Sequence, residues 1–404
     1  MAQTQFDRIV LMANDVDRLG GVGRFISTMA DGFHARGYAT ELVGVSPPPE
    51  GHGQVVERSA DITVRTLMPE PPPPDWTIRS DADKKDRERM RRYRKRFDLR
   101  KIAVDKLRTL LPEWGPRTLI ICTQVYGMEH MLEAGYDAAD PRQPRVIGQY
   151  HGSYDGATRT GRDASRVLQA YADVDRTVFL TAEDAERFRL AGLNNTGWIP
   201  NPVTLAGAET ESGTETGASA AETGTARRNT IVALGRYDEV KSLHYLLAAW
   251  AEIAPALPDW SVELYGEGEL RESLQALIDD RAIPRAALMG KTDAVAEVLA
   301  SAKIHVISSQ HEGLPISIVE AGLSGMPTVS FDCSPGVEML IDSGRTGYIV
   351  AQNNVTALAE RLQALAADPA ALAQMSDEVR ADMAQYAPER ILDRWEDLFR
   401  EMAR

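Results

Sequence analysis

Two glutamates stand out in a stretch that joins two apolar runs of this sequence. The stretch is SSQHEGLPISIVEAGLSGMP, residues 308–327, and it carries Glu312 and Glu320. It follows the strand-like run 303–308 and precedes another at 328–331. A turn that only connects buried strands and helices has no structural need for an acidic residue where it leaves the strand, so we interpret both glutamates as ligand contacts.

The backbone near these glutamates also suits a ligand. We expect Gly313 and Leu314 to open a helix, so that their N–H groups and the helix dipole face an anion. Glu320 would lie about two turns inside the helix, on nearly the same face as Glu312. N–H groups that hold phosphate, with carboxylates that accept from hydroxyls, together fit a nucleotide sugar.

A second turn, GRYDEVKSLHYLL at 235–247, places Arg236 and Lys241 five positions apart. A guanidinium fork and an ammonium point charge can converge on one anion. Taken alone, such a pair is more typical of a solvated surface.

A third glycine-rich turn, NDVDRLGGVGRF at 14–25, follows the first strand-like run. A dinucleotide fingerprint needs a third glycine or alanine where Ile26 stands, and no acid closes the second strand. We therefore do not expect a nicotinamide cofactor. The turn still suits phosphate at a helix start.

Two series of strand-like runs alternate with helical patterns, which predicts two doubly wound α/β domains. The first series covers 8–13, 40–45, 118–123, 145–150 and 177–181, and the second covers 230–235, 261–266, 286–290, 303–308, 328–331 and 347–350. One helix is expected at 242–253.

The seam between these domains lies in an acidic, low-complexity segment. Residues 206–226 contain only Gly, Ala, Ser, Thr and Glu, so we predict a disordered loop over 204–228. Domains are then expected at 1–203 and 229–387. Residues 388–404 should form a helix with one apolar face, made of Ile391, Trp395, Leu398 and Met402.

A basic insertion interrupts the first domain at about 81–111. Between Lys84 and Arg108 there are 13 Lys/Arg and 4 Asp/Glu, a net charge of +9. Because the whole chain has a net charge of −14, the remaining residues carry −23. We predict one amphipathic helix, packed by an apolar stripe and exposing a cationic face. The stripe is Met90, Tyr93, Phe97, Val104, Leu107 and Leu111.

The bulk composition describes a soluble globular protein of two domains. Two cysteines, Cys122 and Cys333, provide neither a disulfide framework nor metal-ligand spacing. We find no signal-peptide pattern and no membrane-spanning run, and therefore expect a cytoplasmic location, with contact at the inner face of the membrane left open.

The ordered motifs of the second half resemble the family-4 retaining glycosyltransferases of GT-B fold. The resemblance is carried by Arg-x4-Lys at 236–241, LYGEGEL at 264–270 and Glu-x7-Glu at 312–320, with SPGVEMLIDSGRTGYIV at 334–350. The first half matches more loosely, through GGVGRF (20–25), YHGSYD (150–155) and IPNPV (199–203). The implied fold is two Rossmann-like domains that face each other across a cleft, with the C-terminal helix crossing back to the first domain.

The resemblance also implies roles. Arg236 and Lys241 would neutralise the donor diphosphate, Glu320 would bind the ribose and Glu312 the transferred sugar. His151 would stabilise positive charge at the anomeric carbon. The other implied donor contacts are Gly21, Gly235, Gly290, Gly313 and Leu314.

The reaction would move a hexose or N-acetylhexosamine from a UDP-sugar to an acceptor hydroxyl with an α-linkage. The departing phosphate could deprotonate the acceptor, so neither a protein nucleophile nor a metal or other cofactor is expected. The cationic face would meet an anionic glycan, a teichoic-acid-like polymer or an anionic membrane, rather than nucleic acid. Its residues are Arg91, Arg92, Arg94, Lys95 and Arg96.

Two other functions stay open at this point. One is a nucleotide-sugar epimerase or hydrolase of the same architecture, which needs no acceptor. The other is a non-catalytic protein that binds anionic glycans, and the complete Arg236, Lys241, Glu312 and Glu320 set favours catalysis over it.

Overall fold

The computed structural model describes residues 5–17, 21–48, 58–74, 80–159, 161–205 and 227–402. The chain divides into two compact units, one formed by 1–202 with 388–404 and the other by 203–387. Almost all of the predicted acidic loop at 204–228 lies outside the described residues.

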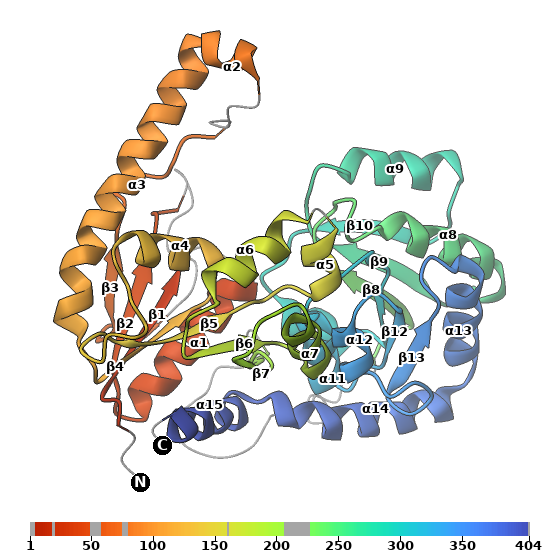
Figure 1. The fold of residues 1–404 in the computed structure, drawn as a ribbon. Coiled ribbons are helices and arrows are strands. Elements are labelled where there is room, and N and C mark those ends of the chain that lie inside the picture. The colour runs from red at the N-terminus through yellow and green to blue at the C-terminus, as the bar shows by residue number, and fades with distance from the viewer. Residues whose placement is uncertain are drawn as a thin grey trace. The chain divides into compact units, whose positions relative to one another are not determined.

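The first unit is built on a seven-stranded parallel sheet in the order β3-β2-β1-β4-β5-β6-β7 (Figure 1). Apolar, largely β-branched runs form the central strands, which are buried because helices cover both faces. The short β3 and β7 were not predicted. The strands are β1 (Arg8–Ala13), β2 (Ala39–Gly44), β3 (Thr63–Thr66), β4 (Thr118–Cys122), β5 (Arg145–Gln149), β6 (Arg176–Phe179) and β7 (Thr196–Trp198).

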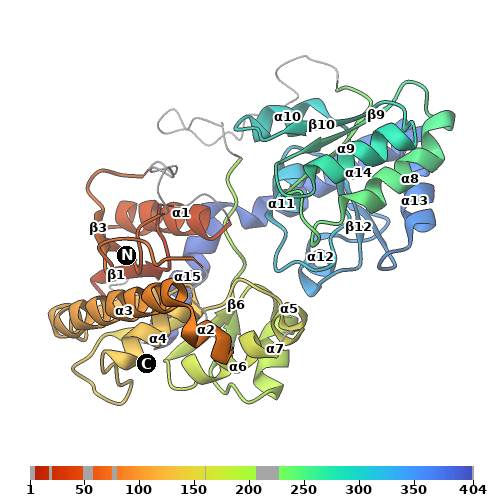
Figure 2. The ribbon, with the colours of Figure 1, turned by 90° about the horizontal axis from the view of Figure 1, so that it is seen from above.

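Two helices far apart in sequence share one core on this sheet. Helix α1 (Gly21–Ala35) buries Phe25, Met29 and Phe33, and α15 (Pro388–Met402) buries Trp395 and Phe399 against them. Figure 2 shows the two helices together. The C-terminal helix is thus part of the first unit. The remaining helices here are α4 (Val125–Glu133), α5 (Tyr154–Thr158), α6 (Arg162–Ala170) and α7 (Ala182–Leu190).

The basic insertion forms a short helix, α2 (Asp81–Lys85), and a long one, α3 (Arg87–Trp114), which starts at the capping carboxylate of Asp86. Only the second half of α3 packs on the sheet, from Leu99 onward. Its first half extends beyond the sheet (Figure 1). The predicted apolar stripe is therefore wrong for this half, where Tyr93 is 40% and Phe97 62% exposed, because none of the described core residues lies beneath it.

The second unit has a six-stranded parallel sheet in the order β10-β9-β8-β11-β12-β13. The two doubly wound sheets predicted from the sequence are confirmed. The strands are β8 (Thr230–Leu234), β9 (Ser261–Tyr265), β10 (Ala286–Gly290), β11 (Ile304–Ile307), β12 (Thr328–Phe331) and β13 (Gly347–Val350). The helices are α8 (Leu243–Ile253), α9 (Arg271–Asp280), α10 (Val295–Ser301), α11 (Ile316–Leu323), α12 (Pro335–Leu340), α13 (Val355–Ala367) and α14 (Pro369–Met383).

Candidate active site

The candidate donor-site residues of the second unit lie where its strand order reverses. β8 and β11 are neighbours at the centre of the sheet, and β9 and β12 follow them on opposite sides. Arg236 lies just after β8, and Glu312 lies between β11 and α11. Ligands of open α/β sheets bind beyond the carboxyl ends of the strands at such a reversal.

The fold joins these two segments through an ion pair. Lys241 Nζ donates to Glu312 Oε1 over 2.6 Å, and Ser309 Oγ donates to the same oxygen over 2.6 Å. The two charged side chains are only 22% and 13% exposed. Because an ammonium carries three N–H donors, Lys241 can hold Glu312 and a further oxyanion together.

Lys241 is positioned by its own loop and by the end of β11. Its backbone N–H donates to Asp238 Oδ1 over 3.0 Å, and its carbonyl accepts from Ser308 Oγ over 3.0 Å. Its aliphatic stem lies over Gly235, where an added Cβ would come within 3.1 Å of Cε. Gly235 therefore leaves room for the lysine.

Two glycines of the LYGEGEL motif pack directly against the backbone of this loop. An added Cβ on Gly266 would lie 1.9 Å from the Gly235 carbonyl oxygen, and one on Gly268 would lie 2.4 Å from the Tyr237 carbonyl oxygen. Only glycine allows this approach. Gly290, at φ +81°, accepts a 2.9 Å hydrogen bond from Gly266 N–H and so belongs to the same support.

Arg236 is placed differently from Lys241. Its side chain is 76% exposed and its guanidinium pairs with Asp238 Oδ2 over 2.8 Å. Asp238 therefore contacts both basic residues, one through the side chain and the other through the backbone. Asp238 was not predicted as a site residue, although an aspartate that accepts from a nearby backbone N–H in a turn is a common local signal.

The helix start predicted at Gly313 and Leu314 is wrong. Helix α11 begins at Ile316, after Pro315 in an extended conformation, because proline disfavours helical backbone in the residue before it. Glu320 is consequently the fifth residue of the helix, about one turn inside it, and is 5% exposed. Gly313 instead packs on Gly336. A Cβ added to Gly336 would lie 2.0 Å from the Gly313 carbonyl oxygen.

Two titratable groups near the ion pair, the buried His305 and the half-buried Cys333, were not predicted as part of the site. Burial lowers the pKa of His305 to about 3, and the charge of Lys241 acts in the same direction. Burial raises the pKa of the Cys333 thiol to about 12. Both groups are therefore neutral near pH 7 and leave Lys241 and Glu312 as the paired charges.

The first-unit candidates gather at α1 and the end of β5. His151 follows β5, and its ring meets that of Phe25 on α1 edge-on, with 5.0 Å between centroids. Both ring nitrogens are buried and bond to no described residue. Burial lowers the pKa of His151 to about 4, so the imidazole is neutral at pH 7. Gly21 is the first residue of the same helix α1.

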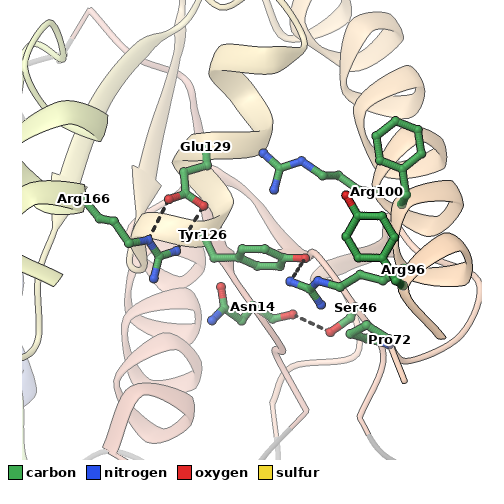
Figure 3. Close-up of a pocket in the computed structure, with 10 residues that line it drawn as sticks. Asn14, Ser46, Pro72, Arg96, Arg100, Tyr126, Glu129 and Arg166 are labelled. Carbon is green, nitrogen blue, oxygen red and sulfur yellow. Dashed lines mark hydrogen bonds and ion pairs between the residues drawn. The ribbon is translucent and has the colours of Figure 1, made fainter. Parts of the chain in front are cut away.

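The five basic residues selected on α3 do not share one surface. Arg91, Arg94 and Lys95 line a cavity at the α2–α3 junction. Arg92 pairs with Glu88 of its own helix. Arg96 lies on the opposite side of α3, where it donates to Tyr126 of α4 (Figure 3).

The described ranges contain neither a cluster of metal ligands nor a membrane-spanning helix. No three His, Cys, Asp or Glu side chains there lie close enough together to hold a metal ion. None of the described helices has both the length and the apolar character needed to cross a membrane.

The chain has the GT-B fold. Over 97% of the chain it superimposes on TarM at a TM-score of 0.76 and 14% identity, and on the Anabaena protein HepE, solved in complex with UDP, at 0.72 and 15%. These matches cover 98% and 99% of those chains.

Part of the sequence also matches a known family. Residues 219–390 match the model of glycosyl transferases group 1. The chain is 32% identical over 253 residues to an uncharacterized glycosyltransferase of Haemophilus influenzae, covering 59% of this chain and 66% of that one. It is 30% identical over 138 residues to the poly(ribitol-phosphate) alpha-N-acetylglucosaminyltransferase of Staphylococcus aureus, covering 34% of this chain and 28% of that one. The chain thus spans less than two thirds of the lengths of these relatives.

Proposed function

We propose that this protein is a retaining glycosyltransferase that transfers a hexose or N-acetylhexosamine from a UDP-sugar to an acceptor hydroxyl, forming an α-linkage. The acceptor would be a glycan, a teichoic-acid-like polymer or a lipid-linked glycan. The observation that carries the proposal is the Lys241–Glu312 pair at the strand-order reversal of the second unit. The UDP bound in HepE and the relative acting on poly(ribitol-phosphate) support the donor and acceptor classes.

In the proposed donor complex, Lys241 contacts the diphosphate while it retains Glu312. The carboxylate then accepts from a hydroxyl of the transferred sugar, so one ion pair aligns the two halves of the donor across the bond that breaks. Arg236 would leave solvent to join the diphosphate, and Glu320 would bind the ribose. Because Lys241 is fixed before the donor arrives, little reorganisation accompanies bond breaking.

In the proposed reaction, the bond between the anomeric carbon and the diphosphate oxygen breaks, and its electron pair leaves with UDP. Lys241 and Arg236 stabilise that charge. The released phosphate oxygen takes the proton of the acceptor hydroxyl, and the acceptor oxygen bonds to the same face of the anomeric carbon. His151, neutral at pH 7, would add no repulsive charge near the developing cation. This chemistry requires no metal.

The test incubates the protein with a panel of UDP-sugars, with and without candidate acceptors, and measures UDP release. NMR of the product then determines the linkage. Acceptor-dependent release with an α-linked product is expected, and EDTA should have little effect. UDP release that is independent of acceptor would favour a hydrolase or epimerase. Loss of activity in EDTA that Mg²⁺ or Mn²⁺ restores would contradict the metal-free reaction.

A further inference from the structure

Asp238 contacts both of the basic residues that the proposed function assigns to the diphosphate. Its Oδ1 accepts from the backbone N–H of Lys241 over 3.0 Å, and its Oδ2 pairs with the Arg236 guanidinium over 2.8 Å. The Asp238 side chain is only 16% exposed. One carboxylate therefore makes a structural contact through one oxygen and a charge contact through the other.

The structural contact belongs to a loop that is fixed at several points. Asp238 Oδ1 bonds the N–H three residues farther along, the Gln310 N–H donates to the Val240 carbonyl over 2.7 Å, and Ser308 Oγ donates to the Lys241 carbonyl. An aspartate bonded in this way sets the path of a turn. Asparagine offers the same Oδ1 acceptor, so this contact does not require the negative charge.

The charge contact is much more open to solvent. Arg236 lies two positions before Asp238 on the same loop, and its side chain is 76% exposed. Lys241 instead pairs with Glu312 of another loop, and these two side chains are 22% and 13% exposed. An ion pair with one exposed partner is weak, so an anionic ligand can displace the carboxylate from Arg236.

We propose that Asp238 is a positioning residue that holds Arg236 beside the donor site until a diphosphate takes its place. This inference rests on the proposed function and deepens it. When the donor binds, the guanidinium moves from Asp238 to the phosphate oxygens, while Asp238 Oδ1 keeps its bond to the Lys241 N–H. Because UDP carries the same diphosphate, the competition also limits how tightly this product is retained after transfer.

The test measures UDP binding to the full chain by calorimetry. Asp238→Asn keeps an acceptor for the Lys241 N–H but removes the charge that competes for Arg236. It should bind UDP about two- to fivefold more tightly than the parent, as expected for loss of an exposed ion pair. If Asp238 served only the shape of the loop, the same variant would bind UDP equally well or more weakly.

The control and a second variant separate the two contacts of Asp238. Glu239→Gln removes an exposed carboxylate at the next position and should change UDP affinity by less than about twofold, because exposed charges are screened. Asp238→Ala removes both contacts and should bind UDP more weakly than Asp238→Asn does. If Glu239→Gln tightened UDP binding as much as Asp238→Asn, net charge alone would account for the gain and the proposal would be wrong.

A double-mutant cycle assigns the gain to Arg236. Arg236→Gln alone should weaken UDP binding about tenfold or more, because it removes a charge-assisted contact. When Arg236 is absent, Asp238→Asn should no longer tighten UDP binding as it does in the parent. Equal gains with and without Arg236 would mean that the carboxylate acts on the ligand directly, which would overturn the proposal.

The same titrations distinguish this inference from the proposed function. A parent chain that binds no UDP up to ~10 mM would contradict the proposed donor and this inference together. A parent that binds UDP no less tightly than Asp238→Asn would overturn this inference alone. The expected pattern of UDP binding, without transfer from any UDP-sugar, would count against the transferase proposal alone.

Discussion

Lys241 and Glu312 lie 71 positions apart in the chain, yet their charged atoms are 2.6 Å apart at the carboxyl edge of the second sheet. The pair is mostly buried, and Ser309 fixes its carboxylate from the other side. Removing one partner of a mostly buried ion pair is destabilising, because the remaining charge is left without its partner. Variants of these two residues should therefore have distinct effects on donor binding and on turnover.

Removal of the Lys241 charge should impair the transfer reaction. Lys241→Met keeps the aliphatic stem over Gly235 but removes the ammonium, so kcat/KM should fall by at least ~100-fold. Lys241→Arg restores the charge with a different shape and should recover part of the loss. Steady-state kinetics with the best UDP-sugar measures both. A Met variant within a factor of a few of the parent would contradict the role of Lys241.

Glu312 and Glu320 should divide recognition of the sugar from that of the ribose. Glu320→Gln should weaken binding of both UDP and the UDP-sugar. Glu312→Gln should reduce turnover while UDP binds at least as well as before, because the substitution leaves Lys241 without its carboxylate. Calorimetry with UDP and kinetics with the UDP-sugar distinguish the two variants. Equal losses of UDP affinity would show that both glutamates serve the nucleotide.

The C-terminal helix should be required for stability of the first unit. Trp395 is fully buried against Phe25 and Phe399, and its replacement by Ala should lower the free energy of unfolding by about 3–5 kcal/mol. Deletion of 388–404 should have a larger effect. Asp397→Ala, on the exposed side of the same helix, is the control. Denaturant unfolding is the measurement, and a truncated chain with unchanged stability would refute the packing role.

The cationic α2–α3 junction should bind an anionic surface. Arg91→Gln, Arg94→Gln and Lys95→Gln together remove three charges from one cavity, each worth about 1 kcal/mol near an anionic bilayer. We expect weaker binding to phosphatidylserine vesicles, a flatter salt dependence and intact UDP binding. Cosedimentation at several salt concentrations measures this.

A matched control removes three exposed charges elsewhere on the first unit, at Arg117, Arg142 and Arg189. If that variant loses as much vesicle binding as the first, net charge alone accounts for the effect. If both variants bind vesicles like the parent, the α2–α3 face is only a solvated surface.

Acid should destabilise the second unit partly through His305. Burial lowers the pKa of His305 from 6.5 to about 3 in the folded chain. Below pH 6.5 the His305 side chain therefore binds a proton in the unfolded chain, whereas in the folded chain it stays neutral down to about pH 3. The free energy of unfolding consequently falls as the pH drops through this window. His305 alone should contribute roughly 2 kcal/mol between pH 6.5 and about pH 4.5.

Denaturant unfolding of His305→Asn across this pH range checks the assignment. The variant should show a flatter pH dependence, whatever its stability at pH 7. Identical slopes for the parent and His305→Asn would mean that His305 is not the titrating group.

Local signals in the sequence determined the two sheets. Short apolar runs bounded by turn residues predicted the central strands within a residue or two, because burial between helix layers demands such runs. The glycines of LYGEGEL contributed only to the family resemblance, and the structure shows that they allow close backbone contact where no other residue fits. The order of the motifs also predicted a resemblance to glycosyltransferases, and the group 1 match over 219–390 is consistent with it. The roles of the individual site residues stay predictions.

Only the tertiary structure decided how the charged and apolar side chains are used. Lys241 meets Glu312 because β8 and β11 are neighbours at the strand-order reversal, a pairing that spacing along the chain cannot encode. The apolar stripe runs along both halves of α3, but only the second half packs on the sheet. Tyr93 and Phe97 therefore line a cavity, while Leu107 is buried. Periodicity shows which residues share a helix face, whereas what covers that face depends on where the neighbouring elements end.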